Sequence, residues 1–123
     1  MILVDTSVWV DHLRRGEPAL AALLNESGVL SHPFVIGELA LGRLRQRDLV
    51  LALLRELPQA TVAEDREVLE IIDRERLYGS GIGYVDTHLV AATRLTPDAR
   101  LWTRDKRLHA AAAKLGLLAV GLR

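Results

Sequence analysis

The chain has 123 residues, half of them hydrophobic, a size and composition typical of one folded domain rather than a disordered segment. Sixteen basic residues balance sixteen acidic ones, so net charge does not indicate a nucleic-acid partner. The absence of cysteine excludes disulfides, thiolate catalysis and zinc–cysteine sites, and is typical of a reducing compartment. No signal-like stretch or membrane-length apolar run is found, so we expect one cytoplasmic domain, residues 1–123, without a membrane partner.

The opening stretch, Met1–Trp9, combines an apolar run with a carboxylate and two hydroxyls. A short apolar run without alternation is typical of a strand buried on both faces. Asp5 follows this run directly, and helical spacing begins after it and extends to Arg15. Asp5 therefore lies at a strand-to-helix junction, where ligands bind in open α/β sheets. Helix capping by Asp5, Thr6 or Ser7 is the competing interpretation.

The next part of the chain is predicted to be mostly helical. The pattern predicts a short strand at 29–31 and helices at 17–26, 34–44 and 48–57. Glu38 lies four residues after Phe34 and three before Leu41, which puts it on the same side of its helix as apolar neighbours. A carboxylate beside a buried face is unfavourable unless it is paired or metal-bound. A solvated helix edge, or a salt bridge to Arg43 or Arg45, is the alternative.

The second half of the chain alternates between helices and strands. In order, the pattern predicts a short strand or loop at 59–62, a helix at 64–78, a glycine-rich loop at 79–83, a helix from Tyr84, a strand at 99–103, a helix ending near Lys114 and a strand at 117–120. Asp86 lies in the first turn of its helix, where the helix dipole favours a carboxylate without any catalytic role. Asp105 follows a predicted strand and could likewise cap the next helix.

Together the four acidic residues are harder to explain as caps and surface charges. Right-handed crossovers bring the carboxyl ends of parallel strands to one edge of a sheet, so Asp5, Glu38, Asp86 and Asp105 are expected to gather there. Clustered carboxylates repel one another and take up protons unless a cation is present. Mg²⁺ is commonly held by one or two carboxylates together with water and substrate phosphate. Such an ion activates water and neutralises a phosphodiester, which is the chemistry of a metal-dependent nuclease.

The same motifs resemble those of a known family. The opening Met1–Trp9, Glu38, the segment Asp86–Ala92 and the segment Leu101–Asp105 are similar to motifs of PIN-domain ribonucleases. The length and the opening resemble the VapC toxins of prokaryotic toxin–antitoxin pairs. This similarity extends over essentially the whole chain. The resemblance implies a PIN-like three-layer α/β fold, in which helices flank a central parallel sheet.

The resemblance also implies an activity and a site. It implies an endoribonuclease that depends on Mg²⁺ or Mn²⁺, cleaves RNA, forms a homodimer and is blocked by a VapB-like antitoxin. By motif position the catalytic residues would be Asp5, Glu38, Asp86 and Asp105, with Asp5 and Asp86 as metal ligands. The hydroxyls of Thr6 or Ser7 and of Thr103 would support these carboxylates through hydrogen bonds.

Partner contacts are expected from arginines and leucines. Arginine suits bidentate phosphate contacts, and the candidates for holding RNA are Arg14, Arg15, Arg43, Arg45, Arg104 and Arg107. The leucine- and arginine-rich helices between Glu17 and Leu57 are the expected antitoxin surface. Core packing explains the same leucines equally well.

Two other functions remain compatible with these residues. A binding module could keep the fold without cleaving RNA, and RNA turnover is the property that separates it from an enzyme. A Mg²⁺-dependent phospho-acceptor signalling domain would carry adjacent acidic residues after its first strand, where this sequence has Asp5 alone.

Overall fold

A small parallel sheet forms the centre of the computed structural model, which describes all 123 residues. Strands β1 (Ile2–Val4), β2 (Val29–Leu30) and β3 (Arg100–Trp102) lie in the order β2-β1-β3. Leu3 of β1 pairs with Leu30 on one side and with Leu101 on the other. The central strand is buried on both faces because both faces carry helices, which explains its uninterrupted apolar sequence. The predicted parallel α/β architecture is confirmed.

Each edge of this sheet is extended by one isolated bridge. Gln59 pairs with Ser31 beyond β2, and Leu118 pairs with Leu101 beyond β3. The strand predicted at 117–120 is therefore wrong as a regular strand. Because the backbone N–H of Arg100 and the carbonyl of Trp102 bond toward β1, only Leu101 presents its backbone groups to the outer edge. The predicted segment 59–62 likewise contributes a single pairing.

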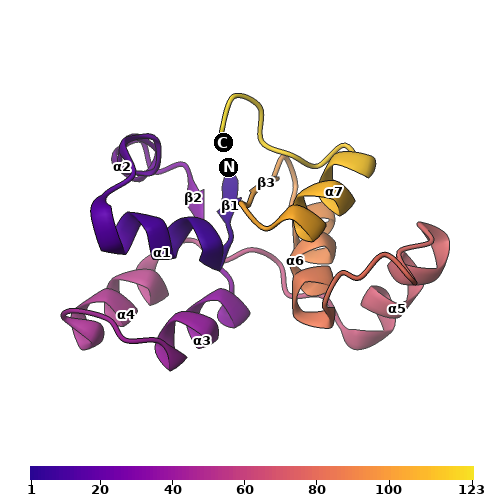
Figure 1. Cartoon of the computed structure of the whole chain (residues 1–123), viewed down its shortest axis with the longest axis horizontal. Helices are drawn as coiled ribbons and strands as arrows, with labels where there is room; N and C mark the ends of the chain where they lie inside the picture. Colours follow the sequence, from indigo (N-terminus) through magenta and orange to yellow (C-terminus); the bar gives the residue numbers. More distant parts are fainter.

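Seven helices surround the strands. They are α1 (Thr6–Arg15), α2 (Pro18–Asn25), α3 (Pro33–Leu41), α4 (Arg47–Glu56), α5 (Asp65–Arg74), α6 (Tyr84–Leu95) and α7 (Lys106–Lys114). Figure 1 shows α1 to α4 on one side of the strands and α5 to α7 on the other, with the two termini close together. None of the helices is long and apolar enough to cross a membrane.

Two helices end earlier than their periodicity predicts. α3 stops at Leu41 rather than at residue 44, because Gly42 takes an extended conformation. α5 stops at Arg74 rather than at residue 78, and two residues later Arg76 has a left-handed φ of 53°. In both places local backbone geometry ends a helix whose apolar spacing would continue.

Helix α6 is the most deeply buried helix. Every residue from Thr87 to Thr93 is buried, and α6 packs against α5, α7 and β3. Burial removes two threonine hydroxyls of α6 from water. Both donate instead to backbone carbonyls one turn earlier in the helix, Thr87 to Gly83 and Thr93 to Leu89. Asp86 immediately precedes this buried stretch, so its backbone is held by the core.

The chain leaves β1 and β3 in opposite directions. After β1 it passes through α1 and α2 to β2, whereas after β3 it passes through α7 to the bridge at Leu118 on the other edge. Such a reversal of strand order opens a crevice at the carboxyl ends of the two strands, where ligands of open α/β sheets bind. Asp5 and Asp105 follow these two strands.

Candidate active site at the carboxyl ends of β1 and β3

Asp5 lies almost completely buried at the end of β1, with 4% of its surface exposed. Its Oδ2 accepts hydrogen bonds from the Ser7 hydroxyl at 2.7 Å, the Thr103 hydroxyl at 2.8 Å and the Ser7 backbone N–H at 3.3 Å. The capping interpretation of Asp5 is therefore confirmed, and the residue lies at the predicted strand-to-helix junction. Oδ1 accepts none of these hydrogen bonds. A buried carboxylate with one fixed oxygen and one spare oxygen is suited to bind a cation.

Glu38 is brought to the start of α1 by the packing of α3 on α1. The Thr6 hydroxyl donates to Glu38 Oε1 at 2.7 Å. Val35 and Leu39, which flank Glu38 on its helix, are buried. The two apolar residues predicted to share its side of the helix, Phe34 and Leu41, are exposed, and so is the carboxylate, so the predicted position beside a buried face is wrong and the solvated helix edge is what the structure shows. The alternative salt bridge is also wrong, because neither Arg43 nor Arg45 pairs with Glu38.

Asp86 is where the electrostatic effect of the cluster is strongest. Its pKa is raised from 3.8 to about 6, first by burial and then by the negative charges of Asp5, Asp105 and Glu38. Four residues from separate parts of the chain thus share one electrostatic neighbourhood. The structure brings together every acidic residue that the sequence singles out.

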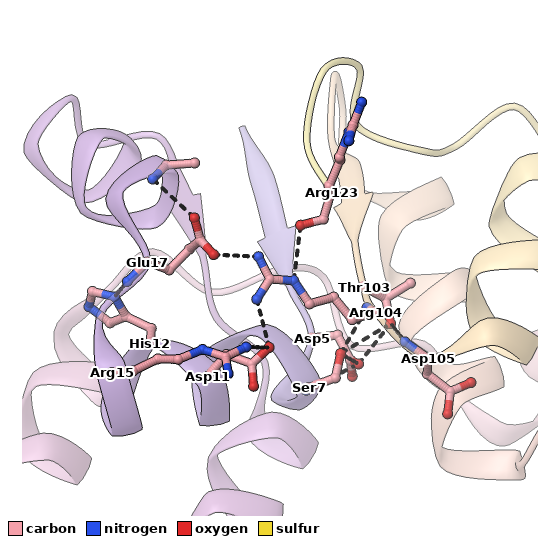
Figure 2. A network of polar contacts seen from close by, with 11 residues as sticks. Asp5, Ser7, Asp11, His12, Arg15, Glu17, Thr103, Arg104, Asp105 and Arg123 are labelled. Atoms are coloured by element: carbon pink, nitrogen blue, oxygen red, sulfur yellow. Dashed lines mark hydrogen bonds and ion pairs between the residues drawn. The ribbon is translucent and has the colours of Figure 1, made fainter.

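Asp105 lies at the end of the segment that follows β3. Its Oδ1 accepts from the backbone N–H groups of Arg107 at 3.0 Å and Leu108 at 2.9 Å, so the capping interpretation holds for this oxygen. The Thr103 hydroxyl, which donates to Asp5, accepts from the Asp105 backbone N–H at 3.0 Å. Figure 2 shows Thr103 between the two carboxylates. Thr103 therefore fixes the spacing between the ends of β1 and β3.

Arg104 has a structural role that the sequence does not reveal. Its guanidinium pairs with Asp11 Oδ2 at 2.6 Å and with Glu17, and its Nε donates to the Arg123 carbonyl at 2.9 Å (Figure 2). These hydrogen bonds lower the pKa of Asp11 and of Glu17 and raise the pKa of Arg104. The Arg104 backbone N–H also donates to the Ser7 hydroxyl at 2.9 Å. Arg104 therefore anchors the loop after β3 to α1 and to the start of α2.

The carboxylates suit a loosely held hard cation better than a closed metal cage. No three acidic or histidine side chains are placed to ligate one ion together. Mg²⁺ needs only one or two carboxylates, because it keeps several waters and binds substrate phosphate. Asp5 and Asp86 fit this mode, since one offers a spare oxygen and the other carries an unfavourable charge that a cation would stabilise. Oxygen-only ligands also exclude a soft-metal site.

The fold and the carboxylate cluster indicate the class of protein, and comparison with known sequences identifies the family. The sequence profile of the PIN domain matches residues 2–114, and the chain belongs to this family. Two curated relatives, one from each of two strains of Mycobacterium tuberculosis, are 52% identical to this chain over 117 residues. Both are called Ribonuclease VapC32. The match covers 95% of this chain and 94% of each relative. The resemblance to PIN-domain proteins of the VapC type is confirmed.

Proposed function

We propose that this protein is a VapC-like endoribonuclease toxin that uses Mg²⁺ or Mn²⁺ to cleave RNA phosphodiester bonds. The observation that carries this proposal is the convergence of Asp5, Glu38 and Asp105 on Asp86, whose pKa they raise together with burial. A cluster of this kind is unfavourable for the apoprotein and becomes favourable when a divalent cation and a phosphodiester occupy it. The relatives named as ribonucleases support the same conclusion.

The residues divide into metal ligands and groups that act on water. Asp5, through Oδ1, and Asp86 would hold the ion, which supplies Lewis-acid activation of water and neutralises phosphate charge when bound. Glu38 and Asp105 lie around this pair and would orient the attacking water and accept its proton. The water oxygen bonds to phosphorus, a phosphorus–oxygen bond breaks, and the leaving oxygen takes a proton from solvent. Thr103 keeps Asp5 in its productive orientation.

The proposal includes two protein partners in the cytoplasm, namely a VapB-like antitoxin that blocks the site and a second copy of the chain. Support for a partner surface comes from α3 and α4. Leu41 is 91% exposed there, Leu49 53% and Leu53 55%, whereas Leu51 and Leu54 on the other side of α4 are buried. Some of the leucines between Glu17 and Leu57 therefore pack in the core, and the exposed ones support the proposal of an apolar surface for a partner.

The test is RNA cleavage by the purified, partner-free protein. Total cellular RNA is incubated with EDTA, Mg²⁺ or Mn²⁺, and Asp5→Asn and Asp86→Asn are run in parallel. We expect cleavage that requires metal and disappears in both variants. Folded protein that binds RNA and metal without turnover would favour the binding module instead. Cleavage that survives EDTA and both substitutions, after removal of contaminating nuclease, would refute the mechanism.

A further inference from the structure

The arginines of this chain differ in whether their charge is already used within the fold. Among the six that are candidates for RNA contact, Arg15 and Arg104 form ion pairs and Arg107 donates to the carbonyl of Gly81. The other three make neither an ion pair nor a side-chain hydrogen bond, and they are Arg14, Arg43 and Arg45. Each of the three is exposed.

These three arginines line the same hollow. It has a volume of about 570 Å³, within the range typical of ligand sites, and Glu38 is part of its wall. Its apolar lining comes from Val10 and Leu13 of α1, Leu39 of α3, and Leu44. The hollow therefore begins at one carboxylate of the proposed active site and continues along α1 toward positive charge.

The loop that carries two of the arginines is held in place. Arg47, at the start of α4, donates through Nη2 and Nε to the carbonyl of Ala40, at 2.9 and 3.3 Å. Leu44, between Arg43 and Arg45, packs against the hydrophobic core. Both neighbouring guanidinium groups therefore extend from a braced segment, which reduces the entropy lost when they bind an anion.

We propose that Arg14, Arg43 and Arg45 form a phosphate subsite that holds RNA on one side of the bond to be cleaved, with the hollow beside Glu38 receiving the adjoining nucleotide. This inference rests on the proposed ribonuclease function. A strand whose phosphodiester lies among the carboxylates must continue in some direction, and this hollow adjoins them with unpaired cations. Guanidinium groups bind phosphate oxygens bidentately, and the apolar lining offers a surface for sugar or base.

RNA is favoured over an acidic protein segment because of the place of Glu38. A polyanion entering this hollow passes a carboxylate, which opposes binding unless the ligand also engages a cation among the four carboxylates. A phosphodiester chain does so as the substrate. A carboxylate of an acidic peptide can also ligate this cation, but the proposed function places a phosphodiester there, and the adjoining phosphates of the same strand then reach the arginines.

Binding is measured in a protein that does not cleave. A fluorescent mixed-sequence single-stranded RNA is titrated into Asp105→Asn protein, which keeps both proposed metal ligands, in Mg²⁺ over a range of salt concentrations. The test variant adds Arg14→Gln and Arg45→Gln, and the matched control adds Arg15→Gln and Arg66→Gln. Arg15 follows Arg14 on α1 but pairs with Asp11, and Arg66 lies on α5. The control therefore removes the same charge without touching the hollow.

We expect the test variant to bind RNA about tenfold or more weakly per arginine removed and the control to bind nearly as the parent does. The slope of log affinity against log salt should fall by about 0.7 for each lost phosphate contact. In the cleaving parent protein the same two substitutions should raise KM more than they lower kcat.

Equal RNA affinity and equal salt slope in the test and control variants would overturn the subsite. Unchanged RNA binding with loss of affinity for an oligoglutamate peptide would overturn it in favour of a protein-docking site. Failure of the ribonuclease proposal is seen separately, as metal-independent cleavage or as cleavage by Asp86→Asn without any arginine change.

Discussion

Replacing Asp86 by asparagine should stabilise the metal-free protein while abolishing its activity. The folded-state pKa of Asp86 is about 6, above its ordinary value of 3.8, because burial and the charges of Asp5, Asp105 and Glu38 disfavour its ionised form. Below pH 3.8 the carboxyl is protonated in both the folded and the unfolded state, so it contributes no penalty. As the pH rises through 6 the folded state must accept the charge, and the full penalty is present above that pH.

The size of this effect follows from the pKa. The rise from 3.8 to about 6 corresponds to about 3 kcal/mol, since each pKa unit is about 1.36 kcal/mol, and partial exposure to water reduces this to about 1–2 kcal/mol. Asparagine loses the attraction between a carboxylate and the N-terminus of α6, which opposes the gain by about 0.3–1 kcal/mol. No side-chain hydrogen bond of Asp86 is lost. The net gain should be about 1 kcal/mol, or about 4 °C in Tm.

Thermal or urea unfolding of wild type and Asp86→Asn, in EDTA from pH 4 to pH 8, measures this gain. The difference in unfolding free energy should grow with pH and level off above about pH 7, and Asp73→Asn on α5 is the exposed control. With saturating Mg²⁺ the order should reverse, because 100 Kd of a ligand that binds only the folded wild type adds about 2.7 kcal/mol. A variant less stable than wild type by the same amount at every pH would refute the reasoning about charge repulsion.

Further substitutions test the surroundings of the site. Thr103→Val should destabilise the fold by about 1–2 kcal/mol, because the buried Asp5 carboxylate loses a donor, and should weaken Mg²⁺ binding about 10- to 100-fold in calorimetry. Arg104→Gln should reduce activity and proteolytic resistance, while Arg15→Gln leaves both nearly unchanged; equal effects would contradict the anchoring role of Arg104. In Asp86→Asn, lowering the pH from 6.5 to 4 should destabilise the fold by up to about 3 kcal/mol, because burial lowers the pKa of His32 to about 4 and the unfolded chain binds that proton first. A flat free energy of unfolding in that range would exclude His32 as the source.

The strand-end carboxylates were predictable because their signal is local. Asp5 follows an uninterrupted apolar run directly, so the strand, the junction and the side of the sheet are all specified within a few residues. Glu38 was only partly predictable, since helical spacing places it on the side of Phe34 and Leu41, and both of these residues are exposed rather than buried. The sequence could not supply the contact that positions it, because the Thr6 hydroxyl comes from another helix.

The contacts of Arg104 were beyond the sequence for a physical reason. Its partners Asp11 and Glu17 lie 93 and 87 residues earlier in the sequence. Nothing in their local sequence distinguishes them from ordinary surface charges. Only the meeting of β1 and β3 at the centre of the sheet brings them within reach. The strand predicted at 117–120 is wrong although its local apolar pattern is present. Only Leu101 of β3 has free backbone groups to pair with this segment, so a single bridge forms instead of a strand.

The neutral net charge does not contradict binding of RNA, because the charges are sorted in space. Asp11 and Glu17 are balanced by Arg104 and Arg15, whereas Arg66 offsets only one of the two charges of Glu64 and Glu70. The acidic charge that remains at the crevice is the part that a divalent cation would bind. The positive charge left unpaired beside it lies on the arginines of the hollow. A net charge of zero is therefore compatible with two adjoining surfaces of opposite sign, one suited to a metal ion and the other to the phosphates that flank it.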